Sequence, residues 1–206
     1  MKNKKGTAWI NLGLLLLAAA LFLAAYNTNE AYRAGTSSEA VIRQLADTLP
    51  TTATVSNQAG VSSLPSSPTE PEKEMPVRTI NGQDYIGVLS IPALELELPV
   101  ISQWSYPWLK IAPCRYSGSI YQDDLIIAAH NYASHFGKLR ELHVGDGLSF
   151  TDMDGHLVSY EVASLETLMP TDMDAMECGE WDLTLFTCTI GGQSRFTLRC
   201  LRKEAG

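Results

Sequence analysis

The stretch WDLTLFTCTIGGQSRFTLRCL, residues 181–201, contains two strand-like segments separated by a pair of glycines. Trp181–Thr187 and Arg195–Leu201 are rich in Thr, Phe and Leu, and apolar residues alternate with polar ones along the second segment. Such alternation is typical of a half-buried strand, and Gly191 and Gly192 allow a flexible connection. The stretch therefore predicts two of the strands of a β domain.

Five further segments upstream have the pattern of short strands. They are Tyr85–Ile91, Leu94–Leu98, Leu125–Ala129, Gly147–Phe150 and His156–Leu165. The continuous apolar run at Leu125–Ala129 indicates a strand buried on both faces, and Asp154-Gly155 is a strong hairpin signal between the last two segments. Six or seven short strands with few helical stretches predict an all-β domain, either a barrel or a sandwich.

An uncharged stretch of 17 residues, Ile10–Tyr26, lies near the N-terminus. As a helix it would reach about 26 Å, near the lower limit for crossing a bilayer. Lys2, Lys4 and Lys5 precede it, so the positive-inside rule predicts a cytoplasmic N-terminus with the rest of the chain outside. A cleaved signal peptide is the alternative, and Ala24-Ala25 followed by Tyr26 matches its cleavage site poorly.

The composition changes again before the strand-rich part begins. Residues 49–76 are dominated by Ser, Thr and Pro and hold five of the ten prolines, a composition that favours a mobile spacer over a packed core. A short helix is expected at Glu39–Leu49. We therefore expect a cytoplasmic tail at 1–9, a transmembrane signal anchor at 10–26, an extracellular stalk at 27–76 and one folded domain at 77–206.

Charge and cysteine content exclude two broad classes. The 206 residues carry 15 Lys and Arg against 23 Asp and Glu, a formal net charge of −8, which argues against a general nucleic-acid binder. Four cysteines are too few for a disulfide-dense scaffold. No cofactor or metal is expected: there is no paired Cys/His zinc spacing and no phosphate-binding loop, and Asp152–Gly155 fits a turn better than a calcium loop.

Cys188 is the cysteine best placed for chemistry. It ends the strand Thr184–Thr187 and precedes the Gly191-Gly192 loop, where a substrate backbone could approach. Cys200 shares one face of the last strand with Phe196 and Leu198, so we expect it in the core. Cys114 and Cys178 lie in loop-like sequence, and they either pair or stay free.

His130 ends the buried strand Leu125–Ala129 and so lies at the rim of a rigid element. The other histidines, at positions 135, 143 and 156, are expected in loops or at strand edges and exposed. A Cys at one strand end and a His at another, with a cation near, is the composition of an activated thiol. The histidine would exchange the proton, and the cation would stabilise negative charge.

Three segments together resemble the sortases, which are membrane-anchored cysteine transpeptidases on the surface of Gram-positive bacteria. Thr184–Cys188 resembles the T-L-x-T-C signature of the family. Ala129-His130-Asn131 with Phe136-Gly137-x-Leu139 resembles its histidine segment, and Ser194-Arg195-Phe196 resembles its arginine strand. The resemblance covers about Tyr85–Lys203 and implies an eight-stranded β-barrel with the three residues in one groove.

The resemblance also implies a role for each residue. Cys188 would be the nucleophile, His130 the general acid and base, and Arg195 the groove cation. Thr187 would line the groove and help to hold the substrate or the oxyanion through its backbone or hydroxyl. Arg199 lies on the same face four residues later and is the alternative cation. Arg195 is preferred because it is nearer the glycine loop and Cys188.

The implied activity is cleavage of an LPxTG-like sorting signal between Thr and Gly through a thioester on Cys188. The acyl group would then pass to an amine of lipid II, a cell-wall precursor, or to a pilin lysine. Some sortases respond to calcium, and no such site is assigned in this chain. The short spacing from Cys188 to Arg195 resembles class D sortases, and the absence of an Asp-Pro pair favours protein anchoring over pilus assembly.

Three other classes of protein stay open on the residues alone. A non-catalytic surface β-domain for adhesion or sensing would explain the anchor, stalk and strands equally well. An L,D-transpeptidase usually has Gly before its Cys and Gly after its His, where this chain has Thr187 and Asn131. A thiol–disulfide exchanger would have a C-x-x-C motif, which the sequence lacks.

Overall fold

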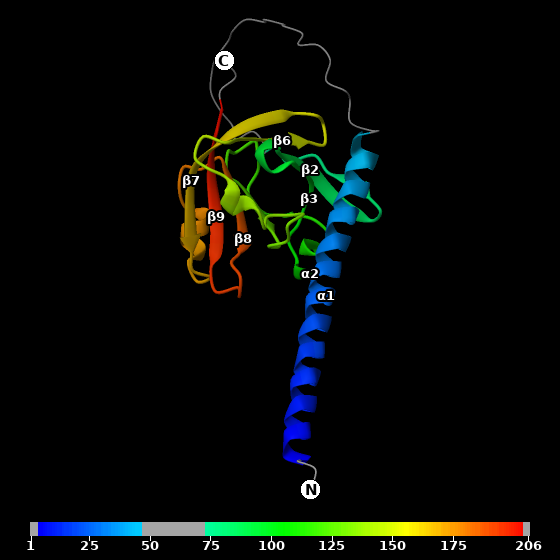
Figure 1. Cartoon of the computed structure of the whole chain (residues 1–206). Helices are drawn as coiled ribbons and strands as arrows, with labels where there is room; N and C mark the ends of the chain where they lie inside the picture. Colours follow the sequence, from blue (N-terminus) through cyan, green and yellow to red (C-terminus); the bar gives the residue numbers. More distant parts are fainter. Residues whose placement is uncertain (1–3, 47–72, 204–206) are drawn as a thin grey trace, which may run out of the picture.

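A computed structural model describes residues 4–46 and 73–203, and it has one long helix beside a closed β-barrel (Figure 1). The helix is α1 (Lys4–Ala46). The strands are β1 (Arg78–Ile80), β2 (Gln83–Ile91), β3 (Leu96–Ile101), β4 (Cys114–Ser117), β5 (Leu125–Ala129), β6 (Gly147–Asp152), β7 (Leu157–Leu168), β8 (Leu183–Cys188) and β9 (Arg195–Arg202). The short helices are η1 (Pro92–Leu94), α2 (Tyr106–Leu109), η2 (Leu139–Glu141) and α3 (Met173–Glu177).

The sheet closes on itself. Its strand order is β1-β2-β3-β4-β5-β8-β9-β7-β6, and a further antiparallel pairing of β2 with β6 joins the two ends. Strands β2 to β9 therefore form an eight-stranded barrel, and β1 extends β2 as a short edge hairpin. The predicted all-β, eight-stranded barrel is confirmed.

Side chains that point into the barrel make up the main core. Apolar residues from β2, β5, β7, β8 and β9 meet there, together with Phe136 and Leu139 of the segment after β5. Phe196, Leu198 and Cys200 of β9 all belong to this core, as their alternation predicts. The interior of the barrel is thus filled with side chains, and any binding or catalytic site has to lie on its outer wall or at a strand end.

Two strand predictions need correction. The segment Leu94–Leu98 was expected to be one strand, but Pro92–Leu94 form a turn of 3₁₀ helix, Glu95 has a left-handed φ of 55°, and β3 begins only at Leu96. Strands β1 and β4 were not expected, and Cys114, predicted in loop-like sequence, is the first residue of β4 and is buried. A four-residue strand is too short for its alternation to be recognised.

The turn between β6 and β7 has the hairpin geometry that Asp154-Gly155 predicts. Gly155 has a φ of 85°. One carboxylate oxygen of Asp152 accepts hydrogen bonds from the backbone N–H groups of Asp154 (2.9 Å) and His156 (2.8 Å). The other accepts one from the hydroxyl of Tyr121. The buried carboxylate therefore organises this turn.

Helix α1 continues well beyond the apolar stretch. Its 43 residues correspond to about 65 Å. The large apolar side chains from Trp9 to Tyr26 are exposed, whereas Ala34, Ser38, Val41 and Leu45 are buried. This spacing of four, three and four residues is one helix face, and it packs on the outer wall of the barrel against Ile80, Tyr85 and Ile101.

The described part of α1 includes the start of the short helix expected at Glu39–Leu49. Residues 47–72 of the predicted stalk lie outside the described residues. In the described ranges, α1 is the one helix long and apolar enough to cross a membrane. The division at residues 26 and 76 stays a prediction.

The Leu45 contact can be tested directly. Because its side chain is fully buried between α1 and the barrel, we expect Leu45→Ala to lower the free energy of unfolding by about 2–5 kcal/mol. Urea unfolding of the full chain in detergent micelles would measure the loss. Arg43→Ala, on an exposed position of the same helix turn, should change the value by well under 1 kcal/mol. Equal stability of the two variants would contradict the docking of α1.

Candidate active site

The site is built on three neighbouring strands, β5, β8 and β9. Strands β5 and β8 are parallel, with Ala129 opposite Thr187, so His130 and Cys188 follow at the same edge of the sheet. Strand β9 is antiparallel to β8, and its first residue, Arg195, lies directly opposite Cys188. The register therefore brings the three predicted residues into one row at the end of the barrel.

The row lies on the outer face of the barrel wall. Leu183 and Leu185 of β8 belong to the interior core, whereas Phe186 packs with the outer cluster. By the same alternation Cys188 is on the outer face, where it is partly exposed. Thr187 is on the inner face: its side chain is buried, and within residues 4–46 and 73–203 its hydroxyl has no hydrogen-bond partner.

His130 is half-buried beside an aromatic ring. The centroids of its ring and that of Tyr132 are 4.9 Å apart, and within the described residues its Nε2 has no hydrogen-bond partner. Burial lowers the pKa of His130, and the positive charge of Lys110 lowers it further, while Glu30 acts in the opposite direction. His130 is therefore neutral near pH 7 and able to accept a proton.

The loop after β5 holds His130 in place. Its carbonyl accepts a hydrogen bond from the N–H of Phe136 (3.2 Å), whose side chain is buried in the core. The carbonyl of Tyr132 accepts from the N–H groups of His135 (2.9 Å) and Gly137 (2.8 Å). A Cβ at Gly137 would lie 2.7 Å from that carbonyl oxygen, so the glycine is needed for this close approach. The Phe136-Gly137-x-Leu139 motif thus fixes the loop that carries His130.

Helix α1 reaches the site, which the sequence reasoning missed. Lys110 Nζ donates a hydrogen bond to Glu30 Oε1 at 3.0 Å, and the Tyr26 hydroxyl donates to the same oxygen at 3.2 Å. The hydroxyl of Ser134 donates to the carbonyl of Ala31 at 3.1 Å. Glu30 falls in the segment expected to be a stalk, and no local pattern in the sequence marks it as a neighbour of His130.

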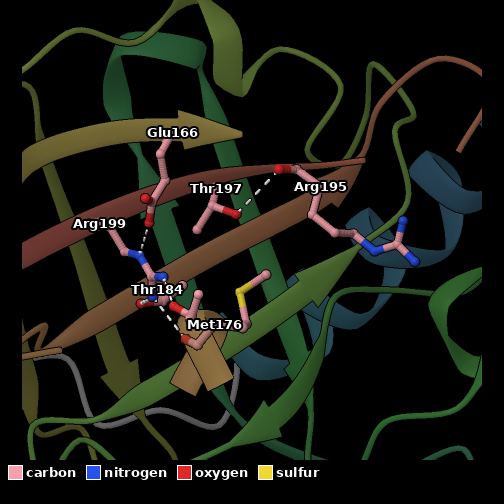
Figure 2. Close-up of polar contacts among 7 residues, drawn as sticks. Glu166, Met176, Thr184, Arg195, Thr197 and Arg199 are labelled. Carbon is pink, nitrogen blue, oxygen red and sulfur yellow. Dashed lines mark hydrogen bonds and ion pairs between the residues drawn. The ribbon is translucent and has the colours of Figure 1, made fainter. Parts of the chain in front are cut away.

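Arg195 has a guanidinium that is not engaged by any carboxylate of the described chain. Its Nη1 makes long contacts to the carbonyls of Gly192 (3.3 Å) and Ser194 (3.4 Å), and Figure 2 shows the side chain extending away from the Arg199 cluster. It borders a pocket of about 240 Å³. The pocket is lined mainly by aromatic and other apolar side chains, among them Trp104, Tyr106, Tyr116, Met176 and Phe186.

Arg199 is occupied elsewhere. It is 2% exposed and donates to Glu166 Oε1 (2.6 Å), to the Thr184 hydroxyl (3.0 Å) and to the carbonyls of Met176 (2.9 Å) and Ala175, as Figure 2 shows in part. These contacts tie the α3 segment to β7 and β8. The arrangement favours Arg195 as the groove cation, because it lies opposite Cys188 while all three nitrogens of the Arg199 guanidinium already donate to other acceptors.

The other cysteines are unlike Cys188. All four are free thiols, so Cys114 and Cys178 do not pair. Cys114 and Cys200 are buried, and burial raises the pKa of each thiol to about 12. Cys178 is exposed in the segment after α3. A buried thiol with so high a pKa is a poor nucleophile, and neither one adjoins a histidine in its strand register.

His135 differs from its prediction because it is fully buried rather than exposed in a loop. Its ring lies 5.6 Å from that of Tyr132, and neither ring nitrogen has a hydrogen-bond partner in the described part of the chain. Burial lowers its pKa to about 4, and the neighbouring His130 adds to the shift. The segment His130–His135 is thus an aromatic stack that favours neutral imidazoles.

Comparison with known proteins now identifies the family. The model of the sortase domain matches residues 89–202, which is more than half of the chain and includes the whole row. The chain belongs to the sortase family. The predicted resemblance is confirmed at this level, and it agrees with the barrel topology.

Solved sortase structures share the fold. Sortase A from Corynebacterium diphtheriae is 22% identical, with a TM-score of 0.55 over 60% of this chain and 63% of that one. Sortase C1 from Streptococcus suis is 25% identical, with a TM-score of 0.51 over 59% of this chain and 74% of that one. This chain therefore spans less than two thirds of the length of the C. diphtheriae sortase. No curated protein sequence matches the chain.

The Arg199 network provides a test of its structural role. Arg199→Met would leave two buried carbonyls and the Glu166 carboxylate without their donor, so we expect a loss of about 3 kcal/mol in the free energy of unfolding. Arg199→Lys should recover part of it, because one ammonium can replace only some of these bonds.

The matched control is Arg202→Met, which removes an exposed ion pair with Asp123 and should cost less than about 1 kcal/mol. Urea unfolding of the full chain measures all three variants. If Arg199→Met were as stable as Arg202→Met, the structural role of Arg199 would be contradicted, and Arg199 would again be a candidate for the groove cation.

His135 predicts a dependence of stability on pH. Its pKa is about 4 when folded and about 6.5 when unfolded. Between these values the unfolded chain binds the proton more readily. The contribution of neutral His135 to the free energy of unfolding is therefore fully present above about pH 6.5 and decreases as the pH drops toward 4. The loss from this one group is about 3 kcal/mol.

In His135→Gln most of this loss between pH 7 and pH 4 should disappear, whatever the effect on stability at pH 7. His143→Gln, which changes an exposed histidine, should keep it. Urea unfolding at a series of pH values gives the free energy of unfolding against pH for the native chain and for the two variants. Parallel curves for the native chain and His135→Gln would show that His135 is not held neutral.

Proposed function

We propose that this protein is a cysteine transpeptidase that cleaves an LPxTG-like sorting signal between Thr and Gly and transfers the acyl group to an amine. The row of His130, Cys188 and Arg195 at the ends of β5, β8 and β9 carries the proposal. Membership of the sortase family supports it. Within the described residues the guanidinium of Arg195 pairs with no carboxylate and makes long contacts to the carbonyls of Gly192 and Ser194, and His130 is neutral.

In the first half of the reaction the sulfur of Cys188 attacks the carbonyl carbon of the substrate threonine, and its proton passes to His130. Arg195 lies opposite Cys188 and offsets the negative charge that develops on the carbonyl oxygen. The bond between Thr and Gly then breaks, and His130 gives the proton to the departing glycine amine. The product is a thioester between Cys188 and the threonine.

In the second half an incoming amine attacks the thioester. His130 accepts a proton from the amine, the carbon–sulfur bond breaks, and the proton returns to the sulfur as the new amide forms. Splitting one difficult acyl transfer into two steps is the usual gain of covalent catalysis. The chemistry needs the three side chains and no metal or organic cofactor.

The pocket beside Arg195 is suited to the apolar part of a sorting signal. Its aromatic rings contact one another in sequence, with centroid distances of 5.0 Å for Trp104–Tyr106, 6.2 Å for Trp104–Tyr116 and 5.4 Å for Tyr116–Phe186. Phe186 is two residues before Cys188 on the same face of β8. Thr187 would help to hold the substrate or the oxyanion through its backbone beside Cys188, since its hydroxyl is on the other face of β8.

We place the protein in the cell membrane as a single-pass protein, with a cytoplasmic N-terminus and an extracellular barrel. The apolar half of α1 is the anchor, and its exposed side chains would face lipid. The substrates are LPxTG-like surface proteins, and the acceptor is an amine of lipid II or a pilin lysine. The seven-residue spacing from Cys188 to Arg195 supports a class D-like enzyme that anchors proteins.

The first test is covalent capture. The full chain in detergent micelles is mixed with an LPxTG peptide and triglycine, and intact-mass spectrometry follows the enzyme and the peptide. We expect an acyl adduct on Cys188 and a peptide cut after Thr and joined to triglycine. In Cys188→Ala both should vanish, because within the described residues Cys188 is the cysteine that the strand register places beside His130 and Arg195.

Two control variants separate chemistry from stability. Cys178→Ala removes an exposed thiol and should leave turnover unchanged, and Cys200→Ala removes a buried one and should mainly lower stability. Turnover retained in Cys188→Ala would refute the mechanism. No adduct across a panel of sorting signals would favour a non-catalytic surface β-domain that keeps the sortase fold.

A further inference from the structure

Helix α1 joins the membrane anchor to the barrel without a break. The apolar stretch ends at Tyr26, and Glu30, one helical turn later, already pairs with Lys110 of the barrel. Four residues of helix rise by about 6 Å. From Ala34 to Leu45 one face of the same helix is buried against the barrel wall. The barrel is therefore held close to the end of the anchor.

The end of the barrel that faces the anchor is the catalytic end. The first contacts of α1 with the barrel, through Glu30 and Ala31, are with Lys110 and with Ser134 in the loop after His130. In Figure 1 strands β8 and β9 lie across the barrel from α1, and their connecting turn lies at the end of the barrel nearer the N-terminal half of the helix. Cys188 and Arg195 flank this turn.

The turn between β8 and β9 is uncharged and has an apolar tip. Residues 189–194 are TIGGQS, and the side chain of Ile190 is 95% exposed. The turn is tied together by a hydrogen bond from the N–H of Thr189 to the carbonyl of Ser194 (2.9 Å). Tyr106 and Met169, which line the pocket beside Arg195, are exposed as well. Ile190, Tyr106 and Met169 thus place several exposed apolar side chains at one end of the barrel, and such a group is suited to an apolar surface.

We propose that the catalytic end of the barrel rests on the bilayer, with Ile190 immersed in the lipid interface and the groove open at the membrane surface. The inference rests on the proposed membrane insertion of α1. The contact is apolar, because the turn has no charge and the chain as a whole is negative. It gives the enzyme lateral access to peptides that are themselves tethered to the membrane.

Site-directed spin labelling tests the contact. The full chain, in a Cys178→Ser and Cys188→Ala background, is labelled at Ile190→Cys and reconstituted in phosphatidylcholine vesicles. A second protein is labelled at Leu157→Cys. Leu157 is 59% exposed and lies at the other end of the barrel. Its strand, β7, pairs Tyr160 with Arg202, which is about 23 Å along β9 from Arg195, and Leu157 lies beyond that pair. Power saturation compares the accessibility of each label to oxygen and to a water-soluble nickel complex.

We expect the ratio of oxygen accessibility to nickel accessibility to be higher for the label at position 190 than for the label at position 157. In aqueous control samples without detergent, where both labels are exposed to water, the two ratios should be similar. Vesicle flotation is measured on the same samples. If the chain floats and both labels are equally open to nickel, the inference is wrong while the anchor stands. If the chain does not float, the anchor fails and the inference with it.

Activity gives an independent readout. In the otherwise native full chain, Ile190→Asp should lower the ratio of the rate on a lipid-tethered LPxTG peptide in vesicles to the rate on the free peptide. Leu157→Asp should leave that ratio unchanged. An unchanged ratio in Ile190→Asp would also contradict the membrane contact.

Discussion

The parallel pairing of β5 with β8 is the constraint on which the site depends. Parallel neighbours end at the same edge of a sheet, so the Ala129–Thr187 register places His130 beside Cys188 although they are 58 positions apart in the sequence. A slip of one residue would turn Cys188 into the barrel interior and Thr187 outward. The buried apolar side chains of both strands therefore hold the register of the candidate site as well as the fold.

Strands with clear alternation or a continuous apolar run were predictable from the sequence. Leu125–Ala129 was predicted with the bounds that the structure gives, and the Cys188 and Arg195 ends of β8 and β9 were close. Strand β4 was missed because four residues with a bulge carry too little periodicity. The burial of His135 was also missed, since a single polar residue in a loop-like segment contains no signal of the core that covers it.

The contribution of α1 to the site could not be predicted because it depends on tertiary packing. Ala34, Ser38, Val41 and Leu45 form a face of small and apolar residues, yet the surrounding segment is polar and resembles a spacer. The pair of Glu30 with Lys110 joins residues 80 positions apart. Once formed, it places one negative and one positive charge near His130, and their opposing effects leave burial as the main cause of the lowered pKa.

Arg195 and Arg199 show how two identical side chains on one strand face come to differ. Each is on the outer face of β9, but the α3 segment covers only the second. A guanidinium 2% exposed has to be satisfied by acceptors, and Glu166, Thr184 and two carbonyls provide them. Arg195 lies past the end of that cover, and within the described residues its Nη1 makes only long contacts, to the carbonyls of Gly192 and Ser194. The same α3 segment that holds Arg199 thus also lines the pocket beside Arg195, through Met176.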